Sequence, residues 1–279
     1  MLDSSPADNT ILIQPSSGWA ALNLREIWQY RDLLTTLAGR DVKLRYRQTA
    51  LGVLWVLVQP LLAAGVFAIV FGRVAKLPSQ GLPYFVFAYA GLLGWNAFSE
   101  TLARGSASLV ENSRLVSKIY FPRLILPLST VFSSLIDFAV ALGLMVFLML
   151  AYRIVPHAGI LLLPVWLFLI VLLAVGLALF TSALMVSYRD VQYVMPVVTQ
   201  MLLYASPVAY AVSAVPRGLR PFFFLNPLTG LLEAFRWSLL GIGDLRWGYV
   251  GYAAAAALLA FAGGAAFFKR MERRFADVI

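Results

Sequence analysis

The chain has 279 residues and a formal net charge of +9, with 61% hydrophobic and only 13% charged residues. A soluble domain carries about 25% charged and about 45–50% apolar residues, so water could not solvate a chain of this composition, whereas a lipid bilayer could. The basic residues lie between long apolar runs, which favours contact with anionic lipid over nucleic acid binding. The sequence has no cysteine and one histidine, which excludes disulfides, thiol catalysis and metal sites built from Cys or clustered His.

The first 50 residues are polar and rich in arginine, without the early apolar core of a cleavable signal peptide. Residues 1–22 show no hydrophobic pattern and are predicted to be disordered. Residues 23–47 carry apolar residues at helical spacing and a cationic face, which predicts an amphipathic interface helix on the membrane surface. Residues 23–279 then form one all-α polytopic membrane domain without a second globular unit.

Six stretches are apolar enough to cross a bilayer, which takes about 20 residues in a helix. The predicted spans are 54–72, 84–103, 124–151, 160–187, 191–212 and 248–268. If the N-terminus lies in the cytoplasm, the inner segments hold fifteen of the 22 Lys and Arg residues and the outer segments hold seven. The positive-inside rule therefore predicts that both termini are cytoplasmic.

Residues 213–246, between the fifth and sixth spans, are apolar but are interrupted by Pro216, Pro221 and Pro227. We interpret them as a re-entrant pair of short helices, which requires surrounding protein or a water-filled cavity. The alternative is an amphipathic loop on the outer surface. Glu233 and Arg236 are three residues apart and share one face of any helix there, where we expect them to form a pair.

Residues 106–121 predict a short, stiff helix between the second and third spans. Asn112 or Ser113 can cap this helix, Arg114 and Lys118 share a cationic face, and Pro122 stops it. The apolar side is predicted to consist of Leu115, Val116 and Ile119. Such a helix can transmit a push from a docked protein into both spans, but an ordinary loop with a proline stop has the same pattern.

Polar and aromatic residues inside the spans are candidates for a transport pathway. Asp137 lies in the middle of the third span, where it either bonds to a Ser or Thr of a neighbouring span or takes part in transport. A proton relay is disfavoured, because no second carboxylate is expected near the middle of the membrane. Aromatic residues can stack on the apolar face of sugar rings, and six lie on suitable spans: Trp55, Tyr84, Tyr89, Trp95, Tyr204 and Tyr210.

The motifs of nucleotide hydrolysis and of serine hydrolases are missing from the sequence. The phosphate-binding pattern G-x-x-x-x-G-K-[ST] does not occur, so nothing in the chain indicates ATP hydrolysis. The single histidine, His157, falls in a short predicted outer loop and supports no Ser-His-Asp set. We therefore expect no catalytic residue, no metal site and no cofactor in this chain.

Several strings in a fixed order resemble one family. They are Tyr30-Arg-Asp-Leu-Leu34, Gly39-Arg-Asp-Val-Lys-Leu-Arg-Tyr-Arg-Gln48, Leu51-Gly-Val-Leu-Trp55, Gln59-Pro60, Lys118-Ile-Tyr-Phe-Pro-Arg123, Tyr188-Arg-Asp190, Ser206-Pro-Val-Ala-Tyr210 and Asn226-Pro227. Over residues 25 to 270 the chain resembles the ABC-2-type permeases of polysaccharide exporters, which move O-antigen, capsule and teichoic acid chains.

The resemblance implies a homodimer of six-span subunits in the bacterial inner membrane, with two copies of an ABC ATPase on the cytoplasmic side and a polyprenyl-linked glycan as substrate. ATP and Mg²⁺ would bind to the ATPase. Residues 106–121 would be the coupling helix, and residues 23–47 would border the ATPase. The implied coupling residues are Asn112, Arg114, Leu115, Lys118, Ile119, Tyr120, Arg31 and Arg40. The six aromatic residues would line the channel. The outer gate would contain Pro216, Asn226, Pro227, Glu233 and Arg236.

Two other functions remain open from the residues. One is an ABC-2 exporter of a small drug or lipid. The other is a membrane-embedded glycosyl or acyl transferase, which would need convergent acids at one membrane face. Glu100, Glu111 and Asp190 are available there, but without a recognisable spacing.

Overall fold

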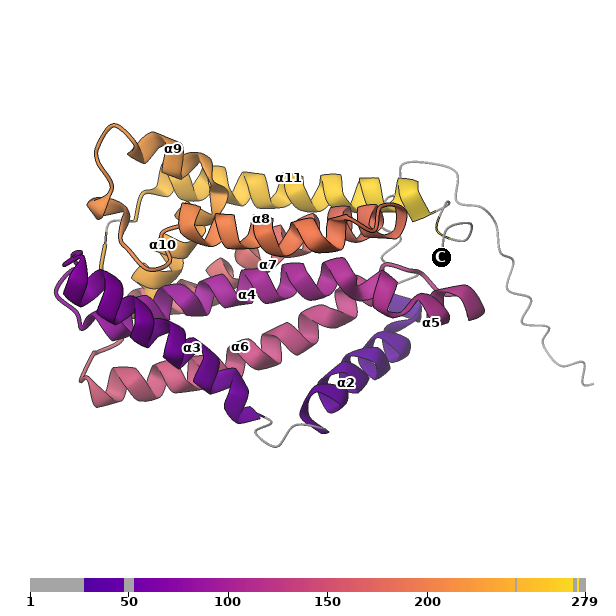
Figure 1. Ribbon diagram of the computed structural model, residues 1–279, viewed down its shortest axis with the longest axis horizontal. Helices are drawn as coiled ribbons and strands as arrows, with labels where there is room; N and C mark the ends of the chain where they lie inside the picture. Colours follow the sequence, from indigo (N-terminus) through magenta and orange to yellow (C-terminus); the bar gives the residue numbers. More distant parts are fainter. Residues whose placement is uncertain (1–27, 48–52, 244, 273–274, 276–279) are drawn as a thin grey trace, which may run out of the picture.

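The computed structural model describes residues 28–47, 53–243, 245–272 and 275. Every regular element among these residues is a helix (Figure 1). The elements in chain order are α2 (Arg31–Arg47), α3 (Val53–Phe67), η1 (Ala68–Val74), α4 (Tyr84–Glu111), α5 (Ser113–Lys118), α6 (Ile125–Ala151), η2 (Ala158–Leu162), α7 (Leu163–Ser187), α8 (Val191–Ala205), η3 (Val212–Ala214), α9 (Arg220–Leu225), α10 (Pro227–Leu240) and α11 (Trp247–Glu272). The predicted disordered segment, residues 1–22, lies outside the described residues.

Helix α4 lies at the centre of the bundle. It packs against α6 and α7, and α7 packs in turn along α11. The short helix α10 enters this bundle and contacts α4, α7 and α11, while α3 lies against α4, and α2 lies against α6 (Figure 1). The molecule thus has two ends, which we name the α5 end, where α5 and the last turn of α11 lie, and the α9 end.

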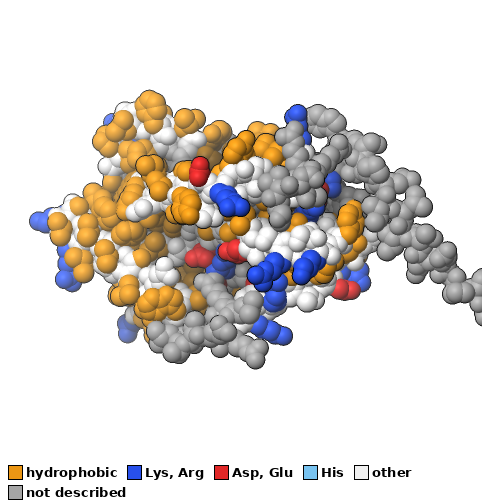
Figure 2. Space-filling model, turned by 45° about the vertical axis from the view of Figure 1, so that its right-hand side comes forward, with side chains coloured by type: hydrophobic (Ala, Val, Ile, Leu, Met, Phe, Trp, Pro, Cys, Tyr) orange, Lys and Arg blue, Asp and Glu red, His pale blue; other side chains and the backbone are white. Residues whose placement is uncertain are grey.

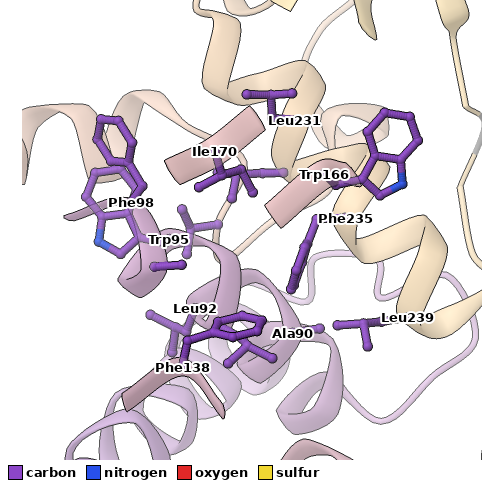
Figure 3. Packing of buried hydrophobic residues seen from close by; sticks show 14 of the residues in the cluster. Ala90, Leu92, Trp95, Phe98, Phe138, Trp166, Ile170, Leu231, Phe235 and Leu239 are labelled. Atoms are coloured by element: carbon purple, nitrogen blue, oxygen red, sulfur yellow. The ribbon is translucent and has the colours of Figure 1, made fainter. Parts of the chain in front are cut away.

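The main core is built where α10 meets the long helices. Figure 3 shows side chains from α4, α6, α7 and α10 converging on one cluster, with Phe235 of α10 among them. The rings of Phe138 and Phe235 meet edge to face at 6.0 Å, and Trp166 donates a hydrogen bond of 2.6 Å from Nε1 to Ser238 Oγ. Residues 213–246 thus contain two short helices, α9 and α10, and α10 is buried within protein, as a re-entrant segment requires. Their re-entry into the membrane stays a prediction.

Among the described residues, four helical stretches are long and apolar enough to span a membrane by themselves. They are Trp55–Val74, Ile125–Ala151, Ala158–Ser187 and Trp247–Glu272. The predicted second span, residues 84–103, is helical throughout, but it carries Glu100 and is followed by Arg104 in the same helix. The fifth is shorter than predicted, because α8 ends at Ala205 in front of Pro207, which lacks an N–H and disfavours helical geometry at Ser206. Its 15 residues reach about 22 Å, so the count of six spans stays a prediction.

The predicted helix over residues 106–121 is wrong in its limits. Helix α4 continues to Glu111, and only Ser113–Lys118 form a separate helix, α5. The side chain of Asn112 does not cap α5; its Nδ2 donates instead to the Ser108 carbonyl at 2.8 Å within α4. The break at Asn112 turns the chain at the α5 end, so α5 connects α4 to α6 as a short corner.

Glycines permit a close helix contact at the crossing of α7 and α11. A methyl group built on Gly264 would collide with the Gly176 carbonyl oxygen, and one built on Gly176 would lie 2.5 Å from the Ala260 carbonyl carbon. Small residues are common at such crossings because they let two backbones approach each other in a membrane. The neighbouring Gly263 faces open space.

We therefore expect Gly264→Ala to destabilise the fold by about 1–3 kcal/mol, the usual cost of overpacking. Gly263→Ala is the matched control, and it should leave the protein unchanged or slightly more stable, because alanine favours a helix more than glycine does. Thermal unfolding of the detergent-solubilised protein measures both. Equal midpoints for the two variants would contradict the close crossing.

Candidate functional site

The α5 end presents basic side chains to the exterior. Arg114 and Lys118 are exposed on α5, while Val116 is buried beneath them and Leu115 is partly buried. Figure 2 shows apolar side chains over the left part of this face and a group of Lys and Arg side chains towards the right. The predicted cationic face of the helix is thus confirmed as an accessible surface, and its role in coupling stays a prediction.

Two predicted coupling residues, Ile119 and Tyr120, lie just after α5, and Ile119 is not buried on the apolar side expected for it. Ile119 is 57% exposed and Tyr120 is 66% exposed, because the chain becomes extended after Lys118. Large apolar side chains exposed beside positive charges are typical of protein docking surfaces. We name Arg114, Lys118, Ile119 and Tyr120 the α5 patch.

Helix α2 is joined to this corner by one polar contact. Arg40 Nη2 donates to Asn112 Oδ1 at 2.7 Å and to Asp41 Oδ1 at 3.0 Å. The other residue predicted on this helix, Arg31, is mostly exposed and lies 5.5 Å from the Trp28 ring centre. Of the two, Arg40 therefore holds the helix to the α4–α5 junction, and Arg31 belongs to the surface.

One contact that was not predicted from the sequence joins the segment between α5 and α6 to the last turn of α11. Arg123 donates from its backbone N–H to Glu272 Oε1 at 3.3 Å and from Nη1 to the Glu272 carbonyl at 2.7 Å. Its guanidinium also lies 5.6 Å from the ring centre of buried Phe275. Arg123 and Glu272 are 149 positions apart, so no local sequence pattern indicates this contact.

A cavity of about 680 Å³ opens between α4, α7 and α8. Its wall runs along α4 from Trp95 to Glu111 and along α8 from Gln192 to Leu203. The complete wall consists of Trp95, Ser99, Glu100, Ala103, Ser106, Ala107, Val110, Glu111, Met185, Gln192, Tyr193, Met195, Pro196, Thr199, Gln200 and Leu203. This volume lies within the roughly 300–1,000 Å³ of small-molecule sites.

A charged cluster lies between this cavity and α6. Arg104 Nη2 donates to Glu100 Oε2 and to Asp137 Oδ2, both at 2.6 Å, and Nη1 donates to Ser133 Oγ at 3.2 Å. Asp137 is thus paired with a cation and not with a neighbouring Ser or Thr alone. This pair was not predicted from the sequence, because Arg104 lies just beyond the predicted end of the second span at residue 103 and Glu100 was not expected to be a second carboxylate near the middle of the membrane.

Only one of the six predicted channel aromatics, Trp95, lines the cavity. Tyr89 is buried in the core, and its hydroxyl donates to the Ala141 carbonyl at 3.0 Å, which argues against a place in a channel. Tyr84 donates to the Ala209 carbonyl at 2.6 Å, and Tyr210 donates to the Tyr204 carbonyl at 2.8 Å. Trp55 and Tyr204 lie exposed on α3 and α8.

Most of the predicted gate residues gather around residues 206–212, which we name the strap; it is non-helical up to Ala211 and ends at Val212, the first residue of η3. The strap leads from α8 towards α9, and most of it is buried. Asn226 donates to Ser206 Oγ at 2.9 Å while its Oδ1 accepts from the Leu228 N–H, so it caps α10, which begins at Pro227. Pro216 is exposed beyond the strap.

Arg236 of α10 binds the strap through hydrogen bonds to its backbone. It is only 3% exposed and donates to the carbonyls of Pro207, Val208 and Tyr210. Its guanidinium lies 4.2 Å from the ring centre of Phe87, a favourable arrangement for a desolvated cation.

The expected Glu233–Arg236 pair is replaced by two separate contacts to the strap. Glu233 Oε1 accepts from the Val212 N–H at 3.1 Å, while Arg236 donates to carbonyls earlier in the segment. Gly91 of α4 permits this arrangement, because a methyl group there would collide with the Val208 carbonyl. The two residues do share a face of α10, as their spacing indicates, but their partners are backbone groups distant in sequence.

Comparisons with known proteins agree on one family. Residues 32–240 match the ABC-2 type transporter family. The chain is 32% identical over 215 residues to the O-antigen export system permease protein RfbA of Myxococcus xanthus, covering 76% of this chain and 82% of that protein.

Two further relatives cover most of the chain. The RfbA protein of Klebsiella pneumoniae is 26% identical over 255 residues, which are 89% of this chain and 95% of that one. The polysialic acid transport protein KpsM of Escherichia coli is 24% identical over 206 residues, which are 71% of this chain and 77% of that one. Since the family match alone covers well over half of its length, the chain belongs to the ABC-2 type transporter family.

Proposed function

We propose that this chain is the membrane-spanning permease subunit of an ATP-driven polysaccharide exporter. The observation that carries the proposal is its similarity, over 76% and 89% of its length, to two permeases named for O-antigen export. Family membership makes the chain a transport subunit, so the alternative of a membrane-embedded transferase is set aside. The same relatives favour a polysaccharide over the small drug or lipid that other exporters move.

Energy would come from a partner ATPase that binds ATP and Mg²⁺, because the sequence itself contains no phosphate-binding loop. The α5 patch supports this division of work. It offers exposed charge and apolar surface at a corner whose two ends continue into the long helices α4 and α6. A push on α5 would reach both helices, since Arg40 and Arg123 fix the corner to α2 and α11.

The exporter would contain two copies of this chain and two ATPase subunits in the bacterial inner membrane, with both termini in the cytoplasm. The excess of basic residues on the α5 side supports this orientation. Helix α8 supports the dimer, because none of its residues is buried within one chain and the cavity lies beside it. The glycan, linked to a polyprenyl carrier, would leave through a path between the two copies.

Deletion of the gene tests the proposed function. We expect polysaccharide to accumulate inside the cells, and we expect the tagged chain to co-purify with the ATPase encoded beside it. Normal surface polysaccharide in the deletion strain, without internal polymer, would refute polysaccharide export.

Reversal of the charges of the α5 patch should uncouple ATP hydrolysis by the partner ATPase from export by this chain. For Arg114→Glu combined with Lys118→Glu we expect about tenfold less export at unchanged membrane levels, as follows from about 1.4 kcal/mol of lost docking energy. ATP hydrolysis by the partner should lose its dependence on this chain. Lys76→Glu combined with Arg217→Glu is the control, because these exposed residues lie at the α9 end. Equal export by the two double variants would rule out docking at α5.

Replacement of Arg236, the buried cation that contacts the strap, should lower the stability of the α9 end. Arg236→Met leaves the carbonyls of Pro207 and Val208 without their donor, at about 1–3 kcal/mol for each buried group. We expect a lower unfolding temperature and a loss of export. Arg217→Met, at an exposed position, should change neither quantity. A wild-type unfolding temperature for Arg236→Met would show that the strap does not depend on this residue.

A further inference from the structure

Helix α11 runs along the whole bundle, from the α9 end to the α5 end (Figure 1). Its 26 residues, Trp247–Glu272, extend over about 39 Å and contain no proline. The alanines of residues 253–257 favour helical backbone, and Gly264 lies directly against the Gly176 carbonyl of α7. An unbroken helix moves as a unit, so a displacement at one of its ends is passed to the other.

The last turn of α11 is bound to the segment between α5 and α6. Besides the two hydrogen bonds from Arg123 to Glu272, Lys269 Nζ lies 2.7 Å from Glu272 Oε2 and holds the carboxylate in place. Phe275, just beyond this turn, is fully buried, and its ring meets that of Phe268 edge to face at 5.5 Å. We name Arg123, Glu272 and Phe275 the clasp. Because hydrogen bonds and a buried ring resist separation, the clasp can pull α11 as well as push it.

The clasp also shares an apolar cluster with α5. Val116 of α5 and Phe121 after it are buried in one cluster with Phe268 and Phe275. Protein interiors are close-packed and transmit displacement. A movement of α5 therefore reaches the end of α11 through packing as well as through Arg123.

The first turns of α11 are bound to α9 and α10. The rings of Tyr249 and Phe224 are stacked at 3.8 Å with 6° between their planes, and the Tyr252 hydroxyl donates to the Leu225 carbonyl at 2.9 Å. Gly230 of α10 permits a close approach, because a methyl group there would lie 3.1 Å from the Tyr249 carbonyl oxygen. Both short helices of residues 213–246 thus contact the end of α11 opposite the clasp.

We propose that α11 is a rod that carries a displacement of the α5–α6 segment to α9 and α10. Arg123 and Glu272 are its positioning residues at one end, and Tyr249 and Tyr252 are those at the other. The inference rests on the proposed ATP-driven export and adds how the energy reaches the far end. It gives α9 and α10 a connection to the α5 end that is separate from α4.

A single thiol on α9 tests the proposal. The chain has no cysteine, and Phe222 is 72% exposed, so Phe222→Cys introduces a unique reactive group. The chain is placed in nanodiscs in complex with its ATPase, and labelling by a maleimide dye is followed on the band of this chain, without nucleotide and with ATP and vanadate. We expect the nucleotide to change the labelling rate by at least about fivefold, the lower range of coupling between distant sites.

Variants of the clasp identify the route. Arg123→Met combined with Glu272→Ala should reduce the nucleotide-dependent change to less than about twofold. ATP hydrolysis by the complex should persist, because the α5 patch is unchanged. Arg123→Lys can still donate to the Glu272 carbonyl and should keep the full response, as should Arg270→Met, an exposed position on the same turn.

Variants at the opposite end separate transmission from local stability. Tyr249→Ala combined with Tyr252→Phe removes the ring stack and the hydrogen bond to Leu225, far from the clasp, and should reduce the response equally. Tyr249→Phe keeps the stacked ring and should keep the response. All four changes together should have no larger effect than either pair, because interrupting one rod twice is not additive.

The outcomes distinguish the rod from the proposed function. A full response in the clasp variant, or additive losses from the two ends, would overturn the rod. The same holds if the thiol on α9 ignores nucleotide while the complex hydrolyses ATP, and polysaccharide export would then still stand. If the chain forms no complex with the ATPase, the proposed function fails, and the rod fails with it.

Discussion

Polar groups that this chain carries into its apolar interior must find partners within the protein, because hydrocarbon offers none. Arg236 is the clearest case. Its guanidinium is buried beneath the strap and donates to strap carbonyls that no helix satisfies. The strap is stabilised by this side chain and by the contacts of Tyr84, Asn226 and Glu233.

Arg104 meets the same requirement at the other end of the bundle. It joins α4 to α6 through Asp137, and to the cavity through Glu100. Removal of one member of a buried ion pair leaves an uncompensated charge, which costs about 3–5 kcal/mol. The cluster therefore fixes how α4 and α6 lie against each other, and its Glu100 forms part of the cavity wall.

Helix α4 connects the three regions with functional features. Its 28 residues extend over about 42 Å. Near its start, Tyr84 and Gly91 contact the strap; residues 95–111 line the cavity; and its end leads into α5. A displacement at the α5 patch would thus reach the cavity and the strap along α4, which is the connection that the proposed ATP-driven transport requires.

The amino-acid sequence determined the class of this protein. Long apolar runs with few charges require a bilayer and, with it, helices. The strings from Tyr30 to Asn226 pointed to the ABC-2 family, and the prolines of residues 213–246 indicated short helices in place of a span. These features are local, so composition, periodicity and proline chemistry are enough to show them.

Only the tertiary structure decided which side chains meet. Arg104 with Asp137, Arg123 with Glu272 and Arg236 with the strap are separated by 33, 149 and 26 to 29 residues. The burial of Tyr89 and the cavity beside Trp95 likewise depend on how the helices rotate about their axes. Helical periodicity gives the face on which a residue lies, but the partner of that face is set by packing between helices distant in sequence.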